Sequence, residues 1–335
     1  MKRQVLTSVR VVLGLFIVTA LALGIFTPSA NAQSSKTSTA NTLKVSPVRS
    51  DVTIKAGESA EVPITITNLT GSDVLVAPIE NDFVQGDENG TPSIILDEDE
   101  YAPTHSLKRF MTPLKNVTVP KNGSTVVKVK ITVPKDAQAG GYFGALRFAP
   151  TTPDTGGQVN LSASVASLIL LTVPGPVTEQ LNLTSFDIQQ GSGKGATDFR
   201  TPNDLKVAFR FENKGNIQEG PFGKISVTQG KDVIYDYDFN ANTPREVILP
   251  DGARKWEVPL KNIGDFGHYT VHATFTYGST NKTIEVEKSF WVIPTYMIIA
   301  AIAIIVLLIA GIAFLIIWLK GRRKRAIRRH AGRRR

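Results

Sequence analysis

The chain has 335 residues, four histidines, a formal net charge of +9 and no cysteine, which excludes a disulfide framework, a thiolate metal site and a cysteine nucleophile. The positive charge is terminal: ten basic residues follow Leu319 and three lie among the first ten, whereas Gln33 to Leu319 holds 25 basic and 29 acidic residues. This slightly acidic body offers no basic face to a phosphate backbone, so nucleic-acid binding is not expected.

The first 32 residues have the layout of a secretory signal peptide. A basic start precedes an apolar stretch from Val11 to Phe26, and the small-residue pattern Ala30-Asn31-Ala32 follows, as in signals that are cleaved. The alternative is an uncleaved anchor, because this apolar stretch is long for a signal core. The Ala-x-Ala ending favours cleavage after Ala32. Residues 33–42 are small and polar, which predicts a flexible leader without a core.

Residues 43–175 alternate between short β-branched or aromatic runs and turn residues, the pattern of strands in a β-sandwich. In "STVVKVKITVP", period two directs one set of side chains to the core and the lysines between them to solvent. The inward set is Val127, Val129, Ile131 and Val133. Pro174-Gly175-Pro176 ends the segment, because proline cannot continue a hydrogen-bonded ladder, and it predicts a short, stiff joint.

Residues 176–292 repeat this pattern with about seven short strands, as expected of an immunoglobulin-like sandwich. In "HYTVHATFTY", one face receives Tyr269, Val271, Ala273, Phe275 and Tyr277. His268 and His272 then point to the opposite, exposed face, and no third metal ligand is identified for them. The predicted fold class is all-β, with two tandem immunoglobulin-like β-sandwiches followed by one transmembrane α-helix.

Residues 293–319 are predicted to form that transmembrane helix. From Met297 to Leu319 there is no charged side chain, and at about 1.5 Å per residue the run reaches roughly 35 Å, enough to cross about 30 Å of hydrocarbon. Trp291 and Tyr296 before the run and Trp318 at its end suit the two membrane interfaces. The alternative, a buried core helix, needs a helical domain around it, and the sequence indicates none.

Residues 320–335 form a basic tail. Lys and Arg directly after a membrane span hold that side in the cytoplasm and are attracted to anionic lipid. The sequence therefore predicts a single-pass protein of the cell membrane, with its N-terminus outside, its C-terminus inside and the lipid bilayer as a partner. The residues assigned to this topology are Lys320, Arg322, Arg323, Lys324 and Arg325.

The order of these features resembles the WxL-interacting protein family of bacterial surface proteins. The resemblance is carried by "LKVSPVRSDVTIKAGESAEVPITITNLTGSDVLV", then "VPKDAQAGGYFGALRFAP" and "SASVASLILLTVPG", then "LKVAFRFENKGNIQEGPFGKISV", and finally the single span and basic tail. The acidic "LDEDEY" segment has no counterpart in the family pattern. The resemblance implies a surface anchor that binds WxL-domain proteins, peptidoglycan or both.

"GGYFGALRF" is the candidate partner-binding segment. Gly140, Gly141 and Gly144 flank Tyr142 and Phe143, and glycine permits close backbone approach by a partner strand or glycan. The alternative is a core strand in which the glycines serve packing against the facing sheet.

No catalytic residue, metal site or cofactor is expected, and the chain is predicted not to be an enzyme. Asp97 to Glu100 lack the glycine-punctuated spacing of calcium loops, which favours a solvated loop. Asp236 and Asp238 share one face of a strand, where two carboxylates could act on a sugar or simply face solvent. Two alternatives to a binding protein follow: a cell-wall or glycan-modifying enzyme, and a structural or chaperone-like surface assembly protein.

Overall fold

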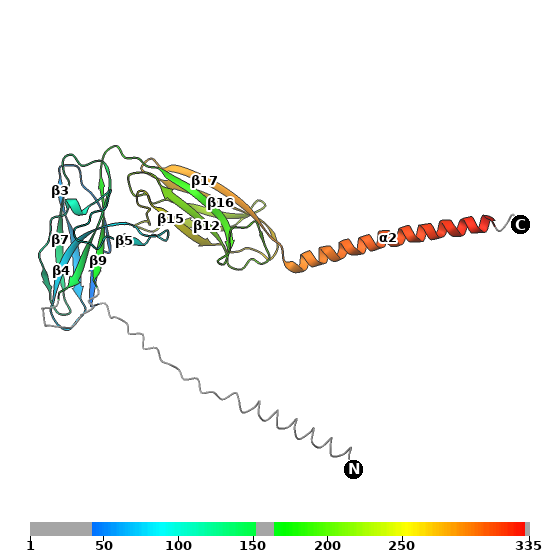
Figure 1. Cartoon of the computed structure of the whole chain (residues 1–335), viewed down its shortest axis with the longest axis horizontal. Helices are drawn as coiled ribbons and strands as arrows, with labels where there is room; N and C mark the ends of the chain where they lie inside the picture. The colour runs from blue at the N-terminus through cyan, green and yellow to red at the C-terminus, as the bar shows by residue number, and fades with distance from the viewer. Residues whose placement is uncertain (1–41, 152–163, 332–335) are drawn as a thin grey trace, which may run out of the picture. The chain divides into compact units, whose positions relative to one another are not determined.

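The structure is a computed structural model that describes residues 42–151 and 164–331, with side chains described up to Leu319. The predicted signal peptide and residues 33–41 of the predicted leader lie outside the described residues, as do residues 332–335 of the tail. Strands dominate the described chain, and one long apolar helix follows them (Figure 1). The predicted fold class, two immunoglobulin-like sandwiches followed by an apolar helix, is confirmed.

The first sandwich consists of two sheets and a short 3-10 helix, η1 (Lys108–Phe110). One sheet has the order β1 (Leu43–Ser46), β3 (Ser59–Asn68), β7 (Ser124–Thr132). The other has the order β2 (Arg49–Thr53), β9 (Val165–Val173), β8 (Gly140–Pro150), β4 (Val74–Gln85), β5 (Pro92–Ile94), with β6 (Val117–Val119) also paired to β4.

The first core lies between these sheets and is aliphatic in character. The alternation expected along β7 is observed: Val127, Val129 and Ile131 are buried, and the lysines between them are exposed. The chain changes sheets between β1, which pairs antiparallel with β3, and β2, which pairs parallel with β9. This change of partner puts Arg49 at one edge of the larger sheet.

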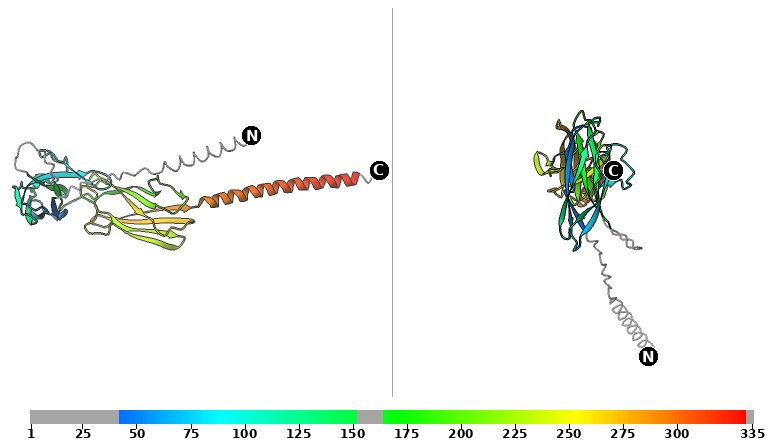
Figure 2. Two further views of the ribbon diagram at one scale, coloured as in Figure 1. Left: turned by 90° about the horizontal axis from the view of Figure 1, so that it is seen from below. Right: turned by 90° about the vertical axis from the view of Figure 1, so that its left-hand side faces the viewer.

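The second sandwich also has two sheets, seen from two further directions in Figure 2. The smaller has the order β10 (Leu181–Gln190), β12 (Leu205–Asn213), β15 (Ala253–Pro259). The larger has the order β11 (Asp198–Phe199), β17 (Lys282–Val292), β16 (Gly267–Tyr277), β13 (Phe222–Gln229), β14 (Asp232–Phe239).

Aromatic rings fill the second core. The ring of Phe209 lies 4.9 Å from that of Phe275 and 5.0 Å from that of Phe239, and Phe211 meets Phe275 edge to face at 5.0 Å. Such tilted and edge-to-face contacts suit the charge distribution of aromatic rings and add to the burial of their large apolar area. The predicted alternation along β16 is confirmed from Tyr269 to Phe275, and Tyr277 is half-buried.

Helix α2 (Thr295–Ala331) begins three residues after the last strand. Its segment Thr295–Leu319 has a mean hydropathy of 3.2, and none of its most apolar 18-residue window is buried. A 25-residue helix that exposes this much apolar surface is consistent with a single membrane span.

Candidate functional site between the two sandwiches

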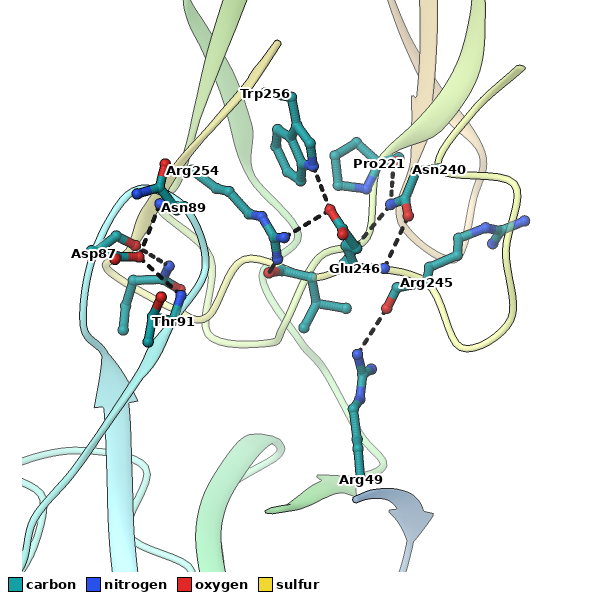
Figure 3. A network of polar contacts seen from close by, with 12 residues as sticks. Arg49, Asp87, Asn89, Thr91, Pro221, Asn240, Arg245, Glu246, Arg254 and Trp256 are labelled. Carbon is teal, nitrogen blue, oxygen red and sulfur yellow. Dashed lines mark hydrogen bonds and ion pairs between the residues drawn. The ribbon is translucent and has the colours of Figure 1, made fainter. Parts of the chain in front are cut away.

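The loop between β4 and β5 extends from the first sandwich to the second. Asp87 organises its turn, because its Oδ1 accepts hydrogen bonds from the backbone N–H of Asn89 and of Thr91, both 2.9 Å long (Figure 3). The bond from Thr91 is the main cause that lowers the pKa of Asp87 below its ordinary value. Asp87 is therefore an ionised, local turn residue.

Glu88, at the tip of this loop, makes two contacts with the second sandwich. Its carboxylate lies 2.9 Å from Nε of Arg210 on β12, and its carbonyl oxygen accepts a 2.7 Å bond from the backbone N–H of Lys255 on β15. Gly90 has a φ of +88° and lies against the guanidinium of Arg254, so a side chain there would collide with it. The loop thus acts as a clamp on the smaller sheet of the second sandwich.

The glycines of the candidate segment lie at a second contact between the sandwiches. The backbone N–H of Gly141 donates to the carbonyl oxygen of Asn216 at 2.9 Å, and the side-chain amide of Asn216 donates to Ala139 at 3.0 Å. A Cβ on Gly140 would lie 2.7 Å from the Asn216 oxygen. Glycine is required here because another backbone approaches closely.

The remaining residues of that segment pack mainly against other residues of the first sandwich. Phe143 is 3% exposed, and its backbone N–H donates a 2.8 Å hydrogen bond to the carbonyl oxygen of His105. Tyr142 is half-buried against the Phe110 ring at 4.8 Å. A side chain on Gly144 would collide with Met111. The segment is therefore a packed strand in which Gly140 and Gly141 lie against the second sandwich and not against the facing sheet, and its binding of an external partner stays a prediction.

A small apolar cluster joins the sandwiches at the base of this contact. Phe83, Phe143 and Leu170 of the first sandwich are buried together with Leu249 of the second. The Phe83 and Phe143 rings meet edge to face, 6.0 Å apart. The cluster therefore removes apolar surface of both sandwiches from water.

Two cavities open beside this cluster. One, of about 290 Å³, is largely apolar and is lined by residues such as Phe83, Leu170 and Leu249. The other, of about 550 Å³, is more polar and is lined by residues of both sandwiches. We call the second the inter-sandwich cleft; residues on its wall include Arg49, Glu219, Phe222, Arg245 and Tyr277.

Two arginines border both cavities. Asp51 holds the guanidinium of Arg49 through bonds of 2.8 and 2.9 Å, and the third nitrogen of Arg49 donates to the carbonyl oxygen of Arg245. The guanidinium of Arg245 lies 3.6 Å from the centre of the Phe222 ring, within the range of a cation–π contact. The cleft therefore presents a charged group stacked on an aromatic ring.

Glu219 is a buried carboxyl at the wall of the cleft, 4% exposed. Burial, and next the nearby Glu179, raise the pKa of Glu219 to about 7. Its Oε2 accepts a 3.1 Å bond from the backbone N–H of Gly278, and Glu179 accepts a 2.7 Å bond from that of Ser279. Both glutamates thus hold the turn between β16 and β17.

The other acidic and histidine residues singled out in the sequence lie outside the cleft. Asp236 forms an exposed ion pair with Lys224 at 2.8 Å, and the hydrogen bond from Lys224 lowers the pKa of Asp236. His272 faces Glu287 at 3.2 Å on the outer face of the larger sheet. Within residues 42–151 and 164–319, no three His, Asp or Glu side chains gather in a way that could hold a metal ion.

The predicted membrane-anchor residues lie at and beyond the end of β17. Trp291, Tyr296 and Trp318 are 42%, 68% and 44% exposed. The five basic residues assigned to topology lie in the continuation of α2. The sequence gives no sign of the role of Glu219 or of the clamp loop, residues 86–91 between β4 and β5, since a turn and an isolated glutamate carry no local sign of distant partners.

No family model and no curated protein matches the chain. Solved structures similar to it include the class 5 fimbrial chaperone CfaA, at 12% identity and a TM-score of 0.37, covering 74% of this chain and 98% of that one. The Escherichia coli chaperone DraB gives 14% identity and a TM-score of 0.32, with 75% and 98% covered. A PapD-like domain of human CEP192 gives 13% and 0.27, with 41% and 87% covered. Similarity at this level carries no argument about function.

Proposed function

We propose that this chain is a membrane-anchored cell-surface binding protein that acts without catalysis. One observation carries the proposal: an open cleft is lined by both sandwiches in a chain that passes directly from the second sandwich into an exposed apolar helix. Two sandwiches on a membrane tether suit the retention of a partner at the cell surface.

The proposed partner is a WxL-domain surface protein, with peptidoglycan as the second candidate, both by the family resemblance. The side chains on the cleft wall favour a polypeptide, because arginine, tyrosine and phenylalanine are enriched where proteins meet. Arg245, Phe222 and Tyr277 supply these groups from three different segments.

We further propose that the sandwiches lie outside the cell and the basic tail inside. The support is the cluster of lysine and arginine directly after Leu319, which retains its side of a span in the cytoplasm. Protease added to intact cells should digest the sandwiches and spare an epitope placed after Arg335. Protection of the sandwiches in intact cells would reverse the orientation.

The acidic groups support a binding role over the enzyme alternative. Asp236 is paired with Lys224 and has a lowered pKa, whereas a general acid needs a pKa near the working pH. Glu219 has a suitable pKa, but its carboxylate accepts a backbone hydrogen bond in the β16–β17 turn. These carboxylates serve the fold.

Capture on the purified full-length chain in lipid nanodiscs tests the proposal, with a purified WxL-domain protein and purified peptidoglycan as separate probes. Arg245→Ala should weaken retention of the bound probe, because it removes the exposed guanidinium stacked on Phe222. Lys121→Ala, an exposed change at the opposite end of the first sandwich, is the matched control. Retention of neither probe by the unaltered chain would refute the binding role, and equal retention by both variants would move the site away from the cleft.

A further inference from the structure

One end of the second sandwich lies directly beside the start of the apolar helix. The register of β16 and β17 pairs Gly267 with Val292 and His268 with Trp291. The loop 260–266, which leads into β16, therefore lies at the same end as the last residues of β17. The segment 191–204, which contains β11, and the turn 230–231 lie at this end as well, because β10 and β13 finish there.

The link from this end to the helix is very short. The backbone N–H of Ile293 still donates a 2.8 Å hydrogen bond to the carbonyl oxygen of Phe199 in the sandwich. Helix α2 begins at Thr295. Only Pro294 separates the two. At a maximum of about 3.6 Å per residue, Ile293 lies within about 7 Å of the first helical residue. The headgroup layer of one leaflet is about 5–8 Å thick, so this end of the sandwich reaches it when the helix spans the membrane.

Two large side chains project from this end. Phe266 is 50% exposed and Trp291 is 42% exposed. The ring of His268 covers part of Trp291, with the ring centres 4.6 Å apart. Trp in particular favours the membrane interface, where its ring is buried and its N–H stays wet.

The loop that carries Phe266 is held in place by the core. The backbone N–H of Gly264 donates to the hydroxyl of Tyr269 at 3.0 Å, and Tyr269 is only 1% exposed. The side-chain amide of Asn262 donates to the carbonyl of Ile234 at 2.9 Å. These bonds fix the loop backbone, so Phe266 is presented outward by a fixed element.

We propose that this end of the second sandwich docks into the lipid interface, with Phe266 and Trp291 inserted among the headgroups. The docking rests on the proposed membrane anchor. Apolar side chains drive the docking, because the charges of these three segments and of the first residue of β14 sum to zero. They are Lys194, Arg200, Lys231 and Lys261 against Asp198, Asp204, Asp232 and Asp265. Docking should therefore occur on phosphatidylcholine, whose zwitterionic headgroup carries no net charge.

The absence of cysteine in the chain permits a direct test. Asp265→Cys places a single thiol beside Phe266 and leaves both aromatic rings intact. Thr280→Cys is the matched control at the opposite end of the β16–β17 hairpin, about 33 Å away along β16. Each full-length variant is labelled with an environment-sensitive fluorophore and reconstituted into phosphatidylcholine vesicles. Quenching is then measured with headgroup spin-labelled lipid and with iodide in the water.

The label at position 265 should be quenched by the lipid and shielded from iodide, and the label at 280 should show the reverse. Adding Phe266→Ser to Asp265→Cys should reduce the lipid quenching several-fold while the unfolding midpoint stays unchanged. Equal iodide quenching at both positions, in protein that resists carbonate extraction, would overturn the docking and leave the anchor intact. Loss of the protein on carbonate extraction would overturn the anchor itself.

Discussion

The guanidinium of Arg49 donates a 2.8 Å hydrogen bond to the carbonyl oxygen of Arg245, 196 residues further along the chain (Figure 3). Asp51 orients that guanidinium by binding its other two nitrogens. Two charge-assisted bonds to one carboxylate fix a planar fork, which is a geometry that lysine cannot reproduce. The same side chain lines both cavities between the sandwiches.

Arg49→Lys should destabilise the chain, because a lysine held by Asp51 cannot also reach the Arg245 carbonyl. The expected loss is about 0.5–1.5 kcal/mol, the net value of one hydrogen bond. Urea unfolding of the full-length protein, followed by the tryptophan fluorescence, measures it. Arg200→Lys, a change at an exposed arginine in a loop of the second sandwich, should leave the unfolding midpoint unchanged.

The ion pair between Glu88 and Arg210 should contribute little. Both side chains are partly exposed, 52% and 30% respectively, and exposed pairs are worth about 0.2–1 kcal/mol. A double-mutant cycle with Glu88→Gln and Arg210→Gln measures the coupling. It should shrink in high salt. A coupling above this range that persists in salt would mean that the clamp loop excludes solvent from the pair.

Gly140→Ala should destabilise the contact between the sandwiches. The added Cβ would lie 2.7 Å from the Asn216 carbonyl oxygen, and the φ of +149° at Gly140 is one that residues with a side chain rarely adopt. Over-packing of this kind costs about 1–3 kcal/mol. Gly71→Ala is the control, since a Cβ there meets no atom within 4 Å. Equal unfolding midpoints for the two variants would contradict this prediction, because they would mean that the contact at Gly140 adds nothing to the stability of the chain.

Glu219 should make stability fall as the pH rises. Its pKa of about 7 in the folded chain lies above the ordinary value of 4.5, so folding favours the protonated form. The contribution of the protonated carboxyl to stability is fully present below pH 4.5, and it is lost as the pH rises through 7. Glu219→Gln keeps an oxygen that accepts from Gly278. At pH 4 the thermal unfolding midpoint of this variant should equal that of the unaltered chain, and at pH 8 it should be higher. A variant midpoint below that of the unaltered chain at pH 8 would contradict the pKa shift.

The membrane span should tolerate one central charge and fail with three. An arginine at the centre costs about 2.5–3.5 kcal/mol, whereas each buried Ile or Leu contributes about 0.3–0.6 kcal/mol. The many apolar residues of Thr295–Leu319 can offset one arginine. Leu308→Arg should therefore stay with the membrane on carbonate extraction. The triple variant Ile304→Arg, Leu308→Arg and Ile312→Arg should be released, and the same three changes to alanine should not.

Much of the fold could be predicted because its signals are local. Strands alternate their side chains with period two, so the buried valines of β7 and the buried face of β16 follow from neighbouring residues. The apolar run after Met297 likewise identifies a helix long enough to span a membrane. For "GGYFG", the sequence predicted close approach by an external partner or by the facing sheet, and it did not indicate that Asn216 of the second sandwich is the neighbour of Gly140 and Gly141.

The site itself depended on tertiary structure. Glu88 and Arg210 are 122 residues apart, and nothing in either local pattern specifies the other. Glu219 acquires its raised pKa only because the fold buries it near Glu179. By itself the sequence determined the all-β class, the alternating faces of strands such as β7 and β16, and the apolar helix, since burial periodicity is written in adjacent residues. Only the packing of one sandwich against the other decided where the cleft lies and which charges line it, because those contacts join residues that are distant along the chain.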